Sequence, residues 1–462
     1  MMQLRNIYFY VTIYLLIYIF YALLSPYFWF DEAGQIYMSL GLNHFSSPNS
    51  TFGSIGDVII NNNKFNLDPG GFSLILFLWL KLSTNYIWIR ILPYLFFIFS
   101  IFLLTKISKS LYNNSYNYFY GIVVFLIPQL VFRSTEIRAY SMDFLSILFS
   151  MYIIVNLSKF KNSELFYSSI IGSFLLSSRY SSIVLFGVVS LIFIILKILD
   201  NNSTNFKKLK SSFIFLFPLL VCVCIIYIVT LSNQNPNLTK ISYADYLIDN
   251  PNLLFENYNW VHLLSISLLL FIYKFDYKIL PNFKILILSS LLINFVFIAL
   301  SFSGVYPYCP FDERNLAIFT YTYVTLIFWI TQKKLFFFKL INNPIIPILF
   351  VILFTLAFNK VLSKNWRNNN LNNDLSDYKI NPNSLVFVER DLIPSTKYLF
   401  EFTKVNSHLN YPNNFIFLER DLFNEKNKLI NSSKEIYLIS NRAIINPNYT
   451  KIGNSLYKIT LK

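Results

Sequence analysis

The stretch "IYFYVTIYLLIYIFYALLSPYFWFDEAGQIYM", residues 7–38, decides the fold class of this chain. It carries no charge until two adjacent carboxylates, Asp31 and Glu32. A helix needs roughly 20 apolar residues to cross about 30 Å of hydrocarbon. The stretch is longer than a signal-peptide core and lacks a clear small-x-small cleavage site. It therefore predicts a mature membrane-spanning helix near residues 7–25, followed at once by a pair of acids.

The composition of the whole chain agrees with a membrane protein. Of the 462 residues, 55% are hydrophobic and 13% are charged, and the mean hydropathy is +0.50. These values are too apolar for a soluble protein of this size. The net charge of +15 comes from short basic clusters between apolar runs, which is typical of cytoplasmic loops and argues against nucleic acid as a partner. Three cysteines and three histidines predict neither a disulfide framework nor a histidine-based metal site.

Uncharged runs of spanning length recur along the first three quarters of the sequence. They predict about eleven membrane-spanning helices. The expected spans lie near 7–25, 87–105, 117–133, 140–157, 164–178, 182–197, 211–231, 259–273, 283–303, 315–331 and 343–360. One further apolar segment, 70–83, is short for a span, and counting it would invert the orientation of everything that follows.

The distribution of basic residues decides this ambiguity. If residues 70–83 stay at the outer surface, the N-terminus is cytoplasmic and the basic clusters fall in cytoplasmic loops. The residues expected inside are Arg5, Lys106, Lys109, Lys159, Lys161, Lys197, Lys207, Lys208, Lys210, Lys274, Lys278, Lys333, Lys334 and Lys339. Those expected outside are Asp31, Glu32, Asp57, Asp68, Glu136, Arg138, Arg179, Asp245, Asp249, Glu256, Asp312, Glu313 and Arg314.

The composition changes to polar and Asn-rich near residue 365, which predicts a transmembrane domain over 1–362 and a small α/β domain over 365–462. With the N-terminus in the cytoplasm, an odd number of spans places the second domain on the outer side of the membrane, in the periplasm or the extracellular space. Short β-branched and aromatic runs indicate strands within 384–394, 414–423, 435–441 and 455–461, and "STKYLFEFTK" (395–404) indicates a helix.

The first outer loop, 26–70, is long enough to be functional. Asp31 and Glu32 open an expected amphipathic helix, "DEAGQIYMSLGL" (31–42). Neighbouring residues on a helix point about 100° apart, so the two carboxylates cannot face one substrate. One acid is expected to perform chemistry or bind metal while the other caps or pairs. Alternatively, both acids only complement the positive end of the helix dipole.

Asp68 closes this loop in "NLDPGGFS" (66–73). Gly70 and Gly71 allow the backbone to approach a ligand closely. Asp68 can bind a metal or a hydroxyl group, or it can cap the helix that follows, and the sequence leaves these alternatives open.

Cations and hydroxyl donors follow at the next outward turns. "FRSTEIRAYSMDF" (132–144) contains Arg133, Glu136, Arg138 and Tyr140, and Arg179 and Arg314 lie at the outer ends of later spans. Fork-shaped donors beside a dry cavity suit a phosphate-bearing substrate. The alternatives are a surface ion pair between Arg133 and Glu136, and arginines that snorkel to the interface.

These motifs, in this order, resemble the GT-C superfamily of polyprenyl-phosphate-sugar-dependent glycosyltransferases, which includes protein O-mannosyltransferases and the lipid A aminoarabinose transferase. The matching features are the Asp31–Glu32 pair, the Pro-containing end of the first outer loop, "WIRILPYLFFIFSIFLLTKISKSLY" (88–112), "EIRAYSMDFLSILFSMYII" (136–154) and an arginine at a late span. The resemblance covers roughly the first 190 residues and does not extend to the C-terminal domain. Relatives often carry Pro-Pro or Lys-Pro where this chain has Asp68-Pro69.

The resemblance implies an inverting hexosyl- or pentosyltransferase in the plasma membrane, with a lipid-linked donor and a lipid, glycan or protein acceptor outside. It assigns Asp31 to the acceptor, with Glu32 in support, and Arg138, with Tyr140, Arg179 and Arg314, to the donor phosphate. Asp68 stays a candidate for the acceptor or for a divalent metal. Two other functions stay open, a transporter or flippase of lipid-linked sugars and a polymerase or ligase of surface polysaccharide.

Overall fold

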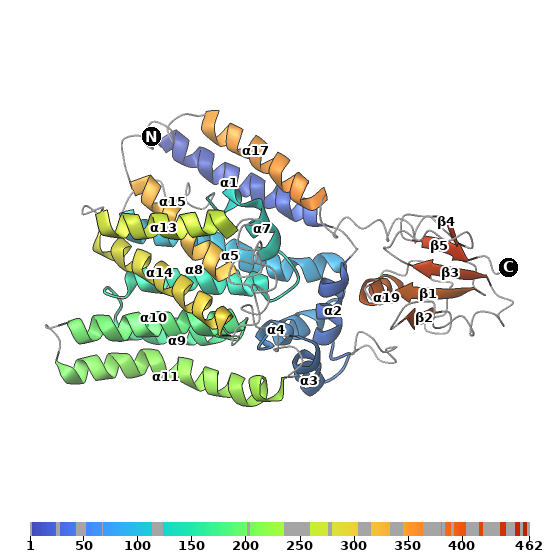
Figure 1. The fold of residues 1–462 in the computed structure, drawn as a ribbon, viewed down its shortest axis with the longest axis horizontal. Helices are drawn as coiled ribbons and strands as arrows, with labels where there is room; N and C mark the ends of the chain where they lie inside the picture. The colour runs from blue at the N-terminus through green and yellow to red at the C-terminus, as the bar shows by residue number, and fades with distance from the viewer. Residues whose placement is uncertain are drawn as a thin grey trace. The chain divides into compact units, whose positions relative to one another are not determined.

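The computed structural model describes the chain in segments. They are residues 2–24, 28–42, 52–66, 68–112, 123–200, 204–234, 259–275, 280–303, 316–332, 345–363, 380, 384–389, 392–402, 415–418, 435–439, 449–452 and 456–459. All statements below concern these residues. Most of them are helical, and a small sheet lies near the C-terminus (Figure 1).

The chain divides into two compact units. Unit 1 consists of Met1–Tyr21, Asn62–Phe72 and Leu92–Asn359. Unit 2 consists of Ala22–Asn61, Ser73–Ile91 and Lys360–Lys462. The residues that follow the first apolar helix therefore belong to the same unit as the C-terminal sheet, which their positions in the sequence do not suggest. The predicted boundary between 362 and 365 stays a prediction.

Unit 1 is a bundle of apolar helices. Its elements are most of α1 (Met2–Leu23), most of α5 (Tyr86–Tyr112), η1 (Val123–Leu126), α7 (Pro128–Ser134), α8 (Tyr140–Asn156), α9 (Asn162–Leu176), α10 (Tyr180–Leu199), α11 (Asn205–Val229), η2 (Leu231–Asn233), α13 (Asn259–Phe275), α14 (Pro281–Phe302), α15 (Leu316–Gln332) and most of α17 (Ile345–Ser363).

Among the described residues, four helices are long and apolar enough to cross a membrane: α5, α10, α11 with η2, and α14. Shorter apolar helices include α1, α8, α13, α15 and α17. One expected span is wrong in its described part. Within 117–133 the chain forms the short η1 and then α7, separated at Ile127, because Pro128 cannot donate the backbone hydrogen bond that a continuous helix requires.

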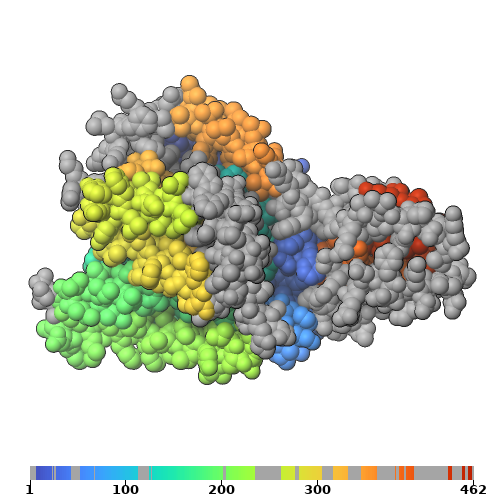
Figure 2. All heavy atoms as spheres, viewed as in Figure 1, coloured from blue at the N-terminus to red at the C-terminus, as the bar shows by residue number. Residues whose placement is uncertain are grey.

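The outer surface of the bundle is strongly apolar. On α11, large hydrophobic side chains are exposed along the whole helix, among them Phe213, Phe217 and Leu220. On α13, Leu264 and Phe271 are exposed in the same way. Both helices lie at the surface of unit 1 in Figure 2. Soluble proteins rarely expose apolar patches of this extent, and lipid is the solvent that suits them.

Besides its sheet and α19 (Ile393–Phe402), the described part of unit 2 contains three short helices from the N-terminal part of the chain. They are α2 (Phe30–Ser39), most of α3 (Ile55–Phe65) and most of α4 (Gly71–Leu80). The helix α4 has 10 residues, too few to cross a bilayer, as its sequence predicts. Reciprocal hydrogen bonds between Ser54 and Asp57 hold the start of α3. The backbone N–H and the hydroxyl of Ser54 both donate to the Asp57 carboxylate at 2.7 Å, and the Asp57 backbone N–H donates to Ser54 Oγ at 3.2 Å. The two bonds to the carboxylate hold the pKa of Asp57 below its usual range.

The sheet has the strand order β2-β1-β3-β5-β4. The strands are β1 (Leu385–Glu389), β2 (Phe415–Leu418), β3 (Ile436–Ile439), β4 (Tyr449–Lys451) and β5 (Leu456–Ile459), and α19 (Ile393–Phe402) connects β1 toward β2. β1 pairs in parallel with β2 and β3, while β5 pairs antiparallel with β3 and β4. Four of these strands and α19 lie where the sequence predicts them, and β4 is an addition.

Side chains alternate between the two faces of the sheet, as the pleat requires. Val386 and Val388 lie in one buried cluster, which also contains residues of α19. Phe387 lies in a second cluster, with Leu438 and Tyr457 among its other members. The first face is the one that meets α2, as described below.

The junction before α4 depends on two glycines. Gly70 has φ 90°, a conformation that favours glycine. The Gly71 N–H donates to the Ser177 carbonyl at 3.0 Å. A Cβ on Gly71 would lie 2.0 Å from Ser177 Oγ and 2.6 Å from its carbonyl oxygen. No side chain fits here without separating the two segments.

We therefore expect Gly71→Ala to lower the free energy of unfolding by about 1–3 kcal/mol, the usual cost of overpacking. Thermal unfolding in detergent measures it. Gly187→Ala is the matched control, because a Cβ at this position in α10 meets nothing within 4 Å. Equal melting temperatures for the two variants would contradict the close contact at Gly71.

Candidate active site

The two acids of the loop that the sequence predicts to be the first outer loop, Asp31 and Glu32, differ in environment. Both lie in the first turn of α2, which begins at Phe30 after the N-cap residue Trp29. Glu32 is fully buried, whereas Asp31 is partly exposed. Negative charge in the first turn of a helix is favourable to the helix dipole, which accounts for the position of the pair in the helix. It does not account for the burial of one carboxylate.

Glu32 is buried because it has a cationic partner. Its Oε1 lies 3.5 Å from Nη1 of Arg90, in the first turns of α5, and both side chains are almost inaccessible. The Arg90 guanidinium also lies 4.5 Å from the centre of the Phe28 ring. Sequence reasoning missed this pair, although Arg90 is the only charge in the apolar run 87–105. A lone charge in an apolar run is a signal that a buried partner exists.

The remaining polar residues of α2 are also held in unit 2. Gln35 donates through Nε2 to Ser73 Oγ at 2.8 Å and to Ser39 Oγ at 3.3 Å. At the end of the helix, Gly41 has φ 74° and terminates it. The helix that carries the acids is therefore fixed along its length by side-chain contacts.

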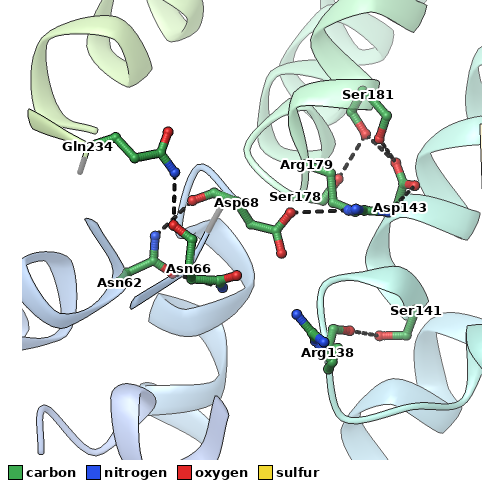
Figure 3. A network of polar contacts seen from close by, with 11 residues as sticks. Asn62, Asn66, Asp68, Arg138, Ser141, Asp143, Ser178, Arg179, Ser181 and Gln234 are labelled. Carbon is green, nitrogen blue, oxygen red and sulfur yellow. Dashed lines mark hydrogen bonds and ion pairs between the residues drawn. The ribbon is translucent and has the colours of Figure 1, made fainter. Parts of the chain in front are cut away.

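A second cluster of charges lies in unit 1, around Arg179 at the start of α10. Arg179 Nε donates to Asp68 Oδ1 at 3.1 Å, and its Nη1 lies 3.8 Å from Asp143 Oδ2. Figure 3 shows that the two carboxylates approach the guanidinium from different segments, Asp68 from the loop before α4 and Asp143 from α8. We call these three residues the Arg179 cluster.

Asp143 is fully buried and its Oδ1 accepts two hydroxyl hydrogen bonds. Ser181 donates at 2.9 Å and Ser182 at 2.8 Å, both from the first turn of α10. Buried carboxylates require such partners, because burying an unpaired carboxylate destabilises the fold by roughly several kcal/mol. Sequence reasoning did not single out Asp143. Its signal was that it is the only charge in 140–157.

Tyr140 lies at the centre of the arginines that the sequence predicted for a phosphate. Its ring centre is 4.5 Å from the guanidinium carbon of Arg179, 5.3 Å from that of Arg138 and 5.9 Å from that of Arg133. Tyr140 is buried, whereas Arg138 is partly exposed. The structure thus brings together Arg138, Tyr140 and Arg179 from the predicted site.

The predicted ion pair between Arg133 and Glu136 exists but does not lie at the surface. The two groups are 3.3 Å apart, and their side chains are 4% and 0% exposed. The surface alternative is therefore wrong, because Arg133 and Glu136 are both buried and neutralise each other inside the bundle.

The loop that carries Asp68 is held by amides. Asn62 Nδ2 donates to the Asp68 carbonyl at 2.7 Å, and Gln234 Nε2 donates to the Asn66 carbonyl at 2.8 Å (Figure 3). Tyr180 donates to Gln234 Oε1 at 3.0 Å. These bonds join the loop to the ends of α10 and α11, so the Asp68 carboxylate is placed by a network rather than by one contact.

Two further predictions concern Arg314 and a divalent metal at Asp68. Arg314 lies outside the described residues, so its place in the site stays a prediction. The described part of the chain holds no group of three or more His, Cys, Asp or Glu side chains that could bind a metal. At Asp68 itself, a guanidinium already occupies the position that a cation would take.

The sequence matches no model of a protein family and no curated protein sequence. The resemblance to the GT-C superfamily rests on the motifs alone.

The buried charges of the Arg179 cluster give a direct test of the geometry. Arg179→Ala leaves Asp143 buried with its two serine donors and without a cation. We expect a loss of about 3–5 kcal/mol in the free energy of unfolding, the usual cost of breaking a buried pair. Denaturation in detergent measures this loss.

The matched control is the double variant Arg179→Ala, Asp143→Asn, in which the amide removes the unpaired charge. We expect it to recover part of the lost stability. If the double variant is as unstable as the sum of the two single variants, Arg179 and Asp143 are not coupled and the pair is contradicted.

Proposed function

We propose that the protein is a membrane glycosyltransferase that moves a hexosyl or pentosyl group from a polyprenyl-phosphate-linked donor to an acceptor outside the membrane. The observation that carries the proposal is the convergence of Arg138 and Arg179 on Tyr140. Two fork-shaped cations and a phenol in one place suit a phosphodiester, whose two non-bridging oxygens share one negative charge and which gains a second charge as the sugar leaves. The donor would be a lipid, which fits an enzyme with an apolar outer surface.

The acid pair supplies the second part of the proposal. Asp31 is partly exposed, and Glu32 beside it is paired with Arg90. This arrangement suits a division of roles, in which Asp31 acts on the acceptor and Glu32 holds the start of α2. A general base must be reachable by substrate, and of the two acids Asp31 has the more accessible side chain.

The proposed reaction is a single displacement at the anomeric carbon. Asp31 takes the proton of an acceptor hydroxyl while the acceptor oxygen forms a bond to that carbon. The bond between the carbon and the phosphate oxygen breaks, and its electron pair leaves with the polyprenyl phosphate. Arg138 and Arg179 would stabilise the negative charge that develops on the phosphate. One in-line attack inverts the configuration of the sugar.

The ends of four helices in unit 1 support the proposed orientation. Arg179 and Asp143 lie at the starts of α10 and α8. At the opposite ends of α8–α11 lie Lys159, Lys161, Lys197 and Lys207. The positive-inside rule would place these lysines in the cytoplasm and the Arg179 cluster outside. The proposal keeps about eleven spans and a C-terminal segment outside the plasma membrane.

A divalent metal is not part of the proposed reaction. Because Asp68 is bound to Arg179, a metal at this carboxylate would have to displace the guanidinium. In this proposal Asp68 holds Arg179 and the loop before α4.

Purified protein in detergent should release bare polyprenyl phosphate from a polyprenyl-phosphate sugar in the presence of membrane lipid, glycan or protein extracts. Chromatography of the lipid products measures the release. If no common donor releases polyprenyl phosphate and the protein moves the lipid-linked sugar across the bilayer of liposomes, the protein is a flippase and the transferase proposal is wrong. Chains of several repeat units added to the acceptor would instead indicate a polymerase.

Asp31→Asn should leave the protein folded and lower the transfer rate by about 10²–10⁴-fold, the usual contribution of general base catalysis. The matched control is Asp57→Asn, which removes an exposed acid from α3 and should change the rate by less than about twofold, as surface substitutions do. Transfer at the unaltered rate in the Asp31 variant would remove this residue from catalysis.

A further inference from the structure

Trp29, two residues before the acid pair, is buried against the C-terminal sheet and α19. Trp29 is 8% exposed, and its ring lies in an apolar cluster whose other members come from the C-terminal segment. They are Ile380, Val386, Val388, Leu392, Ile393, Leu399, Tyr437, Ile439 and Leu456. All of these residues belong to unit 2. The sheet therefore completes its core with a side chain that lies far away in the sequence.

A chain of ring contacts leads from α19 to the buried acid. The Tyr398 ring meets the Phe28 ring edge-on, with centroids 4.5 Å apart. Phe28 in turn lies beneath the Arg90 guanidinium, which pairs with Glu32. The Tyr398 hydroxyl donates to the Thr84 carbonyl at 3.1 Å, in the turn before α5. Through Tyr398, α19 thus contacts both segments that carry the pair: Phe28, shortly before Glu32, and Thr84, shortly before Arg90.

A third contact lies further along α2. The buried Lys397 amine lies 4.8 Å from the centre of the Tyr37 ring. Trp29, Phe28 and Tyr37 bracket the acid pair in the sequence, and each meets the C-terminal segment. Contact along one face of a helix fixes both its position and its rotation.

We propose that Trp29 is a positioning residue, which fixes Asp31 and Glu32 for catalysis by anchoring the start of α2 in the C-terminal sheet. The cluster around Trp29 then positions the acid pair, and the C-terminal segment is not an independent module that recognises the acceptor. This inference rests on the proposed function. The inference goes beyond the proposed function because it assigns a role to the C-terminal sheet, which carries none of the proposed reacting groups.

The physical reason is the short distance along the chain. Asp31 follows Trp29 by two residues, so the indole and the carboxylate share one rigid backbone segment. A misplacement of a catalytic group by 1 Å can cost on the order of 100-fold in rate. Loss of the indole should therefore act on the chemical step, while the arginines proposed for the donor belong to unit 1 and keep their own contacts.

The first test needs no substrate. Ala33 is fully buried on α2, so a cysteine there should react slowly with a maleimide when Cys222, Cys224 and Cys309 are replaced by serine. Adding Trp29→Ala should accelerate labelling by about tenfold or more, because it removes the anchor that opposes local opening. Trp29→Phe, which keeps an apolar ring, should restore most of the protection. Unchanged protection in Trp29→Ala overturns the anchoring role.

The second test separates positioning from stability by steady-state kinetics. Trp29→Ala should lower kcat by about 100-fold and leave KM for the lipid-linked donor within about threefold. Trp29→Phe should regain most of kcat. The control is Lys458→Gln on β5. This substitution breaks the exposed ion pair between Lys458 and Glu435, which involves no residue of α2. It should keep both constants.

The outcomes distinguish this inference from the proposed function. If the wild-type protein transfers sugar and Trp29→Ala labels quickly yet keeps its kcat, the positioning role is wrong and the transferase stands. If KM rises with kcat unchanged, the segment serves binding and the positioning role is also wrong. If the wild-type protein never transfers sugar, the proposed function fails, while the labelling still decides whether Trp29 anchors α2.

Discussion

A guanidinium enclosed by carboxylates, Arg179 between Asp68 and Asp143, is the interaction on which the ends of the helices in unit 1 depend. It joins the loop before α4, the start of α8 and the start of α10. Water would compete for each of these charges at an exposed position, but here the arginine is 3% exposed and Asp143 is fully buried. Burial makes the pair costly to break even where it adds little net stability. Helices with apolar surfaces can slide against each other, and such a pair restricts them to one arrangement.

The same constraint recurs in unit 2, where Arg90 and Glu32 form a buried pair against aromatic rings. Each unit therefore pairs its buried arginines with acids and leaves one group of the predicted site partly exposed, Arg138 in unit 1 and Asp31 in unit 2. A partly exposed cation and a partly exposed anion are the two charges that the proposed transfer from a phosphate leaving group to a hydroxyl acceptor requires. In the proposed reaction the Arg90–Glu32 pair would hold the scaffold, whereas Asp31, Arg138 and the Arg179 guanidinium beside Tyr140 would meet the substrates.

Hydropathy and local pattern predicted much of the fold. The runs 182–197 and 283–303 became α10 and α14, and "STKYLFEFTK" lies largely within α19, because apolar length and strand alternation are local properties. Pro128 broke an expected span into two short pieces, and the three-residue strand β4 was too short to show a pattern. The partners of the charges were not predictable in this way. Asp68 meets Arg179, Glu32 meets Arg90 and Trp29 lies in the apolar cluster of the C-terminal segment, and each of these arrangements joins residues that are distant in the sequence.

The most direct test of the account is a cryo-electron microscopy structure of the protein with a bound polyprenyl-phosphate sugar. We expect the phosphate oxygens to lie within hydrogen-bond distance of the Arg138 and Arg179 guanidinium groups, and the anomeric carbon to face a space that the Asp31 carboxylate reaches. A phosphate bound elsewhere, or a sugar to which Asp31 has no access, would contradict the proposal that this protein is a glycosyltransferase that uses these residues.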